Sequence, residues 1–217
     1  MKQFPRIIAL VVLLLPLHTT ALAQGPARIQ LNAFSQGLDA LHARFSQVVI
    51  SPDSKVQDSS EGQVWLSRPQ RFRWEYGGDY PELVVADGDR IWIYDEMLEQ
   101  VTVKDQALAA VDSPLVLLTE PGRLEQQFEV REAGEIDGAQ LLELNAISAE
   151  YQFERILLGL KDKQLVLMIM EDAFGLRTEL RFDDVRRNPD LDEALFRFEP
   201  PEGTDVIGDL SGAANQR

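Results

Sequence analysis

Residues 63–104, QVWLSRPQRFRWEYGGDYPELVVADGDRIWIYDEMLEQVTVK, decide the fold. This stretch is a series of short apolar runs separated by turn-forming groups such as Gly77-Gly78-Asp79 and Asp87-Gly88-Asp89. Runs spaced about ten residues apart, with such turns between them, are typical of consecutive antiparallel strands. The stretch therefore predicts an antiparallel meander.

The pattern on both sides of this stretch extends the prediction to the whole chain. Runs of the same kind resume after residue 123 and continue to residue 185, and residues 192–207 predict a short helix and a strand. Toward the N-terminus, residues 28–41 carry an apolar stripe that predicts an amphipathic helix weakened by Gly37, followed by a strand over residues 43–50. Residues 51–62, SPDSKVQDSSEG, predict a polar loop. The stripe consists of Leu31, Phe34, Leu38 and Leu41.

The first 23 residues have the pattern of a secretory signal peptide. Lys2 and Arg6 precede an apolar run of 11 residues, which is too short to span a bilayer, and Ala21-Leu22-Ala23 forms a cleavage site. An uncleaved signal anchor is the alternative. We expect cleavage before Gln24, one domain over residues 24–217 with a loose tail after Gly208, and a soluble protein in the periplasm of a Gram-negative bacterium. Export to the medium stays open.

Composition excludes several classes of protein. The 217 residues contain no cysteine and have a formal charge of −15. The lack of cysteine excludes disulfide scaffolds, thiolate metal sites, cysteine nucleophiles and a lipid anchor on an N-terminal cysteine. The acidic balance argues against binding to nucleic acid and to anionic membrane surfaces.

The sequence also predicts no enzyme, cofactor or metal site. His42 is the single histidine after the signal peptide, and no phosphate-binding loop or zinc-protease motif is present. Asp87-Gly88-Asp89 resembles part of a calcium loop but lacks the remaining ligands, so we interpret it as a hairpin turn. A hydrolase built on a pair of carboxylates stays open.

The strand RFRWEY places large rings on one face, where they form either an ordinary core or the lining of a cavity. Phe72, Trp74 and Tyr76 alternate with charged residues and so share that face. Arg68 ends the preceding strand on its apolar side, where an unpaired charge is costly. Its guanidinium either reaches past the strand end into solvent or donates to backbone carbonyls of a covering helix.

Residues 113–118, SPLVLL, predict that covering helix. Ser113 is a suitable N-cap, and Pro114 suits the first helical position. The following residues 115–118 are apolar on all sides, which is typical of a helix that is buried or covers an apolar surface. The chain is therefore expected to contain a central helical insertion.

Several of these patterns together resemble LolA, the periplasmic outer-membrane lipoprotein carrier family. They are LHARFSQ (41–47), G-x-x-W-L-x-R-P-x-x-F-x-W (62–74), the V-x-D-G-x-x-I-W-x-Y-x-x-x-x-E-Q run within residues 84–100, SPLVLL (113–118) and F-x-F-x-P-P-E-G (196–203). Each pattern is weak alone, but the ordered set covers most of the mature chain and is specific.

The resemblance implies an incomplete antiparallel barrel of about 11 strands, mainly β with some α, covered by a lid of short helices. It implies a monomeric carrier that accepts lipoproteins from an ATP-driven release complex in the inner membrane and delivers them to an outer-membrane receptor. It also implies that Arg68 locks the lid. The residues expected to line the acyl-chain cavity are Phe45, Phe72, Trp74, Val84, Trp92, Leu115, Val116 and Leu118.

Two other functions remain as alternatives. A lipid or lipoprotein sensor on the same fold would show a similar strand pattern, although a further domain or an anchoring cysteine would be expected in it. A periplasmic hydrolase would depend on His42 or on the carboxylates.

Overall fold

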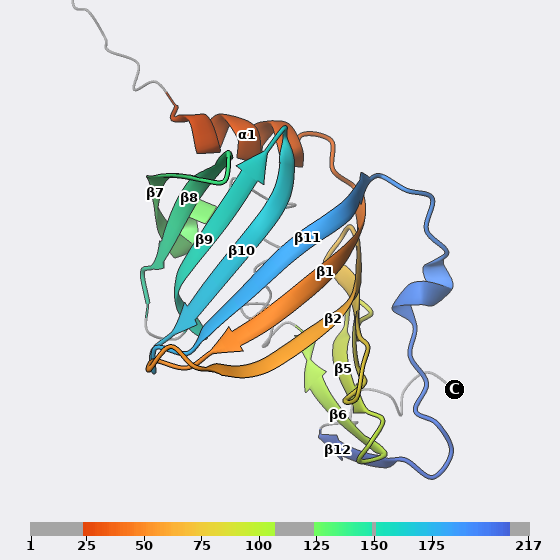
Figure 1. Cartoon of the computed structure of the whole chain (residues 1–217). Coiled ribbons are helices and arrows are strands. Elements are labelled where there is room, and N and C mark those ends of the chain that lie inside the picture. Colours follow the sequence, from red (N-terminus) through yellow and green to blue (C-terminus); the bar gives the residue numbers. More distant parts are fainter. Residues whose placement is uncertain (1–23, 107–123, 149–150, 209–217) are drawn as a thin grey trace, which may run out of the picture.

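The computed structural model describes residues 24–106, 124–148 and 151–208, which form a curved sheet with one longer helix against it (Figure 1). The helix α1 spans Pro26–Ser35. Twelve strands form one sheet in the order β12-β6-β5-β4-β3-β2-β1-β11-β10-β9-β8-β7. They are β1 (Ala40–Ile50), β2 (Val56–Ser67), β3 (Arg71–Tyr76), β4 (Glu82–Ala86), β5 (Arg90–Asp95), β6 (Gln100–Asp105), β7 (Phe128–Ile136), β8 (Ala139–Ala146), β9 (Phe153–Lys161), β10 (Gln164–Asp172), β11 (Arg177–Arg187) and β12 (Asp205–Gly208).

The sheet is an open barrel, as predicted. Its order begins at β12 and ends at β7, and these two edge strands are not paired with each other in the part of the chain that the structure describes. The described residues also include two short helices, α4 (Leu124–Gln127) and η2 (Glu193–Phe196). Within the same residues, no helix is both long and apolar enough to span a membrane.

The predicted meander is confirmed as β2 to β6, each strand antiparallel to the next. Its Asp87-Gly88-Asp89 segment is a turn, in which Asp87 Oδ1 accepts hydrogen bonds from the backbone N–H groups of Asp89 and Arg90. The described residues contain 12 strands, where about 11 were expected. The last strand, β12, pairs with β6 in parallel, because the C-terminal segment crosses the outer face of the sheet before it reaches this edge.

Two predicted boundaries were wrong. The N-terminal helix ends at Ser35, because Gly37 takes a positive φ of 64°, and Leu41 belongs to β1. The segment predicted as a polar loop contains only a short turn, and β2 begins at Val56. Its polar residues pair with β1, for example Ser60 opposite Gln47, because backbone hydrogen bonds do not require apolar side chains.

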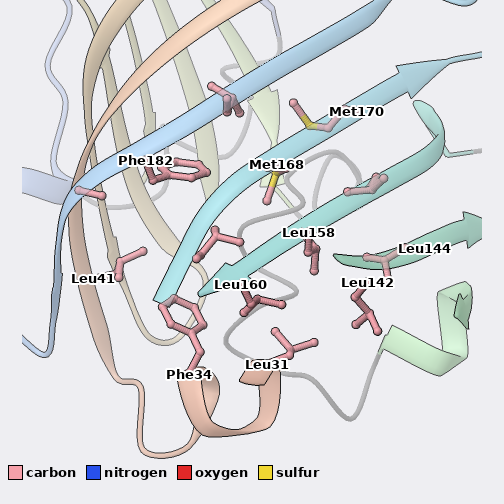
Figure 2. Close-up of a cluster of buried hydrophobic side chains, with 14 of the residues drawn as sticks. Leu31, Phe34, Leu41, Leu142, Leu144, Leu158, Leu160, Met168, Met170 and Phe182 are labelled. Atoms are coloured by element: carbon pink, nitrogen blue, oxygen red, sulfur yellow. The ribbon is translucent and has the colours of Figure 1, made fainter. Parts of the chain in front are cut away.

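The main core lies between α1 and the concave face of the sheet (Figure 2). The helix contributes Leu31 and Phe34, which are fully buried. Glu132 of β7 holds the start of the helix, since its carboxylate accepts hydrogen bonds of 3.0 Å from the N–H groups of Ala27 and Arg28. From the strands come Leu41, Leu142, Leu144, Leu158, Leu160, Met168, Met170 and Phe182.

Candidate functional site: the concave face of the sheet

Four of the residues predicted for the cavity share the concave face. Phe45 belongs to the core cluster on that face together with Val64 of β2. Val64 lies opposite Trp74 on β3, and Trp74 lies opposite Val84 on β4. Directly opposed residues of neighbouring strands point to the same side of a sheet. Phe72 shares the parity of Trp74, so Phe45, Phe72, Trp74 and Val84 all face inward.

The rings at the centre of this face form an aromatic cluster. The centroid of Phe45 lies 4.9 Å from that of Trp74 and 5.3 Å from that of Tyr76, and Trp74 and Tyr76 are 6.2 Å apart. The predicted set of cavity residues omitted Tyr76, although its alternation with Trp74 in RFRWEY indicated the same face. We call Phe45, Trp74 and Tyr76 the aromatic cluster.

A glycine opposite Phe45 makes room for this cluster. Gly62 of β2 pairs with Phe45 on one side and with Tyr76 on the other. A Cβ atom at Gly62 would lie 2.8 Å from Cζ of Phe45 and would collide with the backbone oxygen of Glu75. The absence of a side chain at this position therefore lets the ring of Phe45 lie close to the backbone of β2.

Trp92 was predicted for the cavity, and the structure corrects this prediction. Val84 lies opposite Ile93 and Val85 lies opposite Trp92, so Ile93 faces inward and Trp92 faces outward. Trp92 packs 5.8 Å from the ring of Phe198 in the C-terminal segment. Its indole nitrogen donates a 2.8 Å hydrogen bond to Oδ2 of Asp87. The run Ile91-Trp92-Ile93 is apolar on both faces, so the pattern alone could not reveal which side was covered by the C-terminal segment.

The outer face also holds Trp65 and His42. Their rings are stacked with centroids 5.1 Å apart and an interplanar angle of 13°. Nε2 of His42 lies 3.0 Å from Oε1 of Gln63. The histidine on which a hydrolytic triad would depend thus takes part in an aromatic stack on the convex side. Within the described residues, no group of three or more His, Cys, Asp or Glu side chains is arranged to hold a metal ion.

Arg68 follows the last residue of β2, at the end of the sheet near the start of β1. Its backbone N–H donates to the carbonyl of Asp39 at 2.9 Å, and its Nη1 lies 3.9 Å from Oδ1 of Asp39. Its side chain is 41% exposed. The predicted lid residues Leu115, Val116 and Leu118 lie outside the described residues, so the contact between Arg68 and a lid stays a prediction.

A polar groove of about 610 Å³ adjoins the aromatic cluster. It lies at the end of β2 and β3 that is farther from Arg68. Gln47 and Tyr76 line its inner end, where the Tyr76 hydroxyl donates a 3.3 Å hydrogen bond to Oε1 of Gln47. Burial, and then the charge of Asp95, raise the pKa of Glu82. Burial is also the main cause that raises the pKa of Tyr76. The carboxylates around the groove are Asp58, Glu61, Asp79 and Glu82.

The concave side therefore changes from apolar rings to acidic and amide groups along the same strands. Such a surface can accept a molecule with an apolar part and a polar part. The apolar part would lie against the aromatic cluster, and the polar part would lie in the groove.

A family model and two relatives with similar sequences share one description. The family model described as "Outer membrane lipoprotein carrier protein LolA" matches residues 36–199. The chain is 41% identical over 185 residues to the outer-membrane lipoprotein carrier protein of Xanthomonas campestris pv. campestris (strain B100), which covers 84% of this chain and 88% of that protein. It is 40% identical over 196 residues to the protein of that name from Dechloromonas aromatica (strain RCB), covering 90% and 92%.

The fold also has a counterpart among solved structures. The crystal structure of an uncharacterized conserved protein from Thermus thermophilus superposes with a TM-score of 0.55 at 16% identity. The match covers 84% of this chain and 99% of that one. At this identity the likeness concerns the fold alone.

Proposed function

Because the chain belongs to the LolA family of outer membrane lipoprotein carrier proteins, we propose that it carries lipoproteins across the periplasm by sheltering their acyl chains on its concave face. The observation that carries this proposal is the aromatic cluster on the inner side of an open sheet, next to a polar groove. Acyl chains are apolar, and the attached polypeptide is polar.

The energetics explain why a carrier is needed. A triacylated anchor has about 45 methylene groups, and exposing each one to water costs roughly 0.8 kcal/mol. The total is on the order of 35 kcal/mol, so free diffusion through water is negligible. A carrier must also release its cargo. That requirement favours modest affinity and a closed state that competes with the ligand.

The proposal includes partners and a role for Arg68. The cargo is accepted from an ATP-driven complex of the inner membrane and is passed to a receptor at the outer membrane, and the carrier acts as a monomer. Arg68 holds a lid formed by residues 115–118 over the empty concave face. The acidic character of the chain, −15 in formal charge, supports transit without adhesion to anionic membranes.

A release assay tests the carrier function. Purified mature protein is added to spheroplasts that make labelled lipoproteins and contain the matched release complex. We expect ATP-dependent appearance of lipoproteins in the soluble fraction, bound to the protein in stoichiometric amounts. No release by the folded protein would refute the proposal.

Two variants on one strand test the assigned face. Val84 and Leu83 of β4 are both half-buried, but Val84 faces inward and Leu83 packs on the outer face. Val84→Asp should abolish release, because it places a charge among the acyl chains, and Leu83→Asp should leave release intact. Circular dichroism verifies that both variants fold. Equal release by the two variants would show that the concave face does not hold the cargo.

A further inference from the structure

The indole nitrogen of Trp74 is a buried hydrogen-bond donor without an acceptor. Three buried side-chain nitrogens in the described residues have no partner: Arg28 Nη1, Arg71 Nε and Trp74 Nε1. The other two belong to guanidinium groups that bond through a different nitrogen, Arg28 to Glu125 and Arg71 to Oγ of Ser67. An indole has a single donor, so Trp74 has no second way to be satisfied.

The indole N–H of another tryptophan, Trp92, does have an acceptor. On the outer face, Nε1 of Trp92 donates to Oδ2 of Asp87 at 2.8 Å. Trp74 differs, because it lies on the concave face that the proposed function assigns to the cargo. Leaving a buried donor unpaired is unfavourable. A buried donor without an acceptor requires an explanation, and at a binding surface a ligand can supply that acceptor.

The surroundings of Trp74 restrict what that acceptor can be. Its ring packs against Phe45 and Tyr76, and its cross-strand partner on β4 is Val84. The Tyr76 hydroxyl already donates to Gln47. A buried water molecule needs two to four polar partners, and among these neighbours only the Tyr76 hydroxyl could serve as a second one. An uncharged acceptor attached to an apolar chain meets the requirement, because it brings no charge into the apolar face.

We propose that Nε1–H of Trp74 donates a hydrogen bond to an ester carbonyl of the diacylglyceryl group of a bound lipoprotein. This inference rests on the proposed carrier function. The ester groups of such a cargo lie between its acyl chains and its polypeptide. Trp74 lies next to Tyr76, and Tyr76 lines the inner end of the polar groove. Trp74 is therefore close to the boundary between the aromatic cluster and the groove, where the ester groups would lie. The hydrogen bond sets the depth at which the acyl chains lie and selects ester-linked lipids.

A comparison of two lipopeptides tests this hydrogen bond. The probes are a synthetic lipopeptide with two ester-linked dodecanoyl chains on its glyceryl-cysteine and the same peptide with two ether-linked dodecyl chains. Affinity is measured from displacement of a polarity-sensitive dye bound to the mature protein. We expect wild type to bind the ester about five-fold more tightly than the ether, which is the effect of one ordinary hydrogen bond. Trp74→Phe keeps an aromatic ring but has no N–H, and its ester preference should fall to about one.

Trp65→Phe is the matched control, because Trp65 stacks on His42 on the outer face. It should keep the wild-type preference. The indole ¹H–¹⁵N resonance of Trp74 should also move downfield on binding the ester and not the ether. The shift itself is measured in the wild-type protein, and the resonance is assigned by its loss from the otherwise unchanged spectrum of folded Trp74→Phe.

The outcomes separate this inference from the function on which it rests. Binding of neither lipopeptide by wild type would refute the carrier function, and this inference with it. Equal binding of ester and ether by wild type, or an ester preference that survives in Trp74→Phe, would refute the hydrogen bond alone. The same comparison is made with ester-linked and ether-linked phosphatidylglycerol of the same chain length. An ester preference seen with these phospholipids but not with the lipopeptides would refute the assignment to lipoproteins.

Discussion

Asn188 and Gly37 are joined by a 2.7 Å hydrogen bond from Nδ2 of Asn188 to the backbone oxygen of Gly37, across 151 positions of sequence. Oδ1 of the same side chain accepts hydrogen bonds from the N–H groups of Asp39 and Ala40, at 2.8 and 3.1 Å. One amide after β11 thus satisfies three backbone groups of the turn between α1 and β1. It holds the helix where its apolar side covers the concave face.

Replacement of Asn188 should loosen this turn. Asn188 has a φ of 51°, a value that glycine adopts without strain. Asn188→Gly removes the hydrogen bonds without adding strain to the folded backbone, although it also raises the entropy of the unfolded chain. We expect a loss of about 1 kcal/mol, because the site is exposed and water replaces part of the bonding. Asn188→Ala adds backbone strain and should lose more. Urea unfolding of the three proteins measures both differences, and a glycine variant as stable as wild type would contradict the role of the amide.

A side chain at Gly62 should disturb the aromatic cluster. Gly62→Ala places a Cβ atom against the backbone oxygen of Glu75 and 2.8 Å from Cζ of Phe45. We expect a loss of roughly 1–3 kcal/mol in the free energy of unfolding, as for other overpacked sites. Gly77→Ala is the matched control, since the nearest atom to its Cβ is 3.6 Å away. Similar midpoints of thermal unfolding for the two variants would show that the close approach does not matter.

The groove carboxyl of Glu82 should make stability depend on pH. Burial and the charge of Asp95, which lies opposite it on β5, raise its pKa above the ordinary value of 4.5. The folded state therefore binds this proton more tightly than the unfolded chain does. Its contribution to stability is largest when Glu82 is protonated and declines as pH rises from about 4.5 through the raised pKa.

Two variants isolate this contribution. Glu82→Gln should be more stable than wild type at neutral pH, and the difference should shrink as pH falls toward 4.5. Asp95→Asn should also make stability depend less on pH, because it removes the second cause that raises the pKa of Glu82. Urea midpoints measured between pH 4 and 8 check both. A stability difference between wild type and Glu82→Gln that does not change with pH would contradict this account.

Arg68→Leu should slow the hand-over of cargo. In the proposed function, Arg68 stabilises the closed state that competes with cargo, so its loss favours the cargo-bound state. We expect transfer to the outer-membrane receptor to be several-fold slower, with acceptance of cargo unimpaired. Arg68→Lys retains the charge and should transfer at an intermediate rate, because its single ammonium cannot make all the contacts of a guanidinium. Transfer by Arg68→Leu at the wild-type rate would remove Arg68 from this role.

Local patterns predicted the strands well and the helix boundary poorly. Turn residues such as Asp87-Gly88-Asp89 act through bonds to their own neighbours, so their effect is visible in the sequence. The end of α1 was predicted at residue 41, because Leu38 and Leu41 continue the helical spacing. Both residues do enter the same core, but Leu41 does so from β1. An apolar spacing tells which residues are buried more reliably than which element carries them.

The site shows the same division. The alternation in RFRWEY was enough to place Phe72, Trp74 and Tyr76 on one face, because side chains alternate along any regular strand. The run Ile91-Trp92-Ile93 has no such alternation, so the sequence could not show that Trp92 faces outward. That outcome depends on Phe198, which lies more than a hundred residues later and covers the outer side of β5.

The sequence by itself determined the meander, the aromatic face of β3 and the resemblance to a lipoprotein carrier, because these depend on the order and spacing of neighbouring residues. The tertiary structure alone decided which face of β5 is concave, that Asn188 fastens α1 to the sheet and that Nε1 of Trp74 is left without an acceptor. Each of these depends on strand register and on contacts between distant segments. Such contacts form only when the chain closes around one core, so no local pattern contains them.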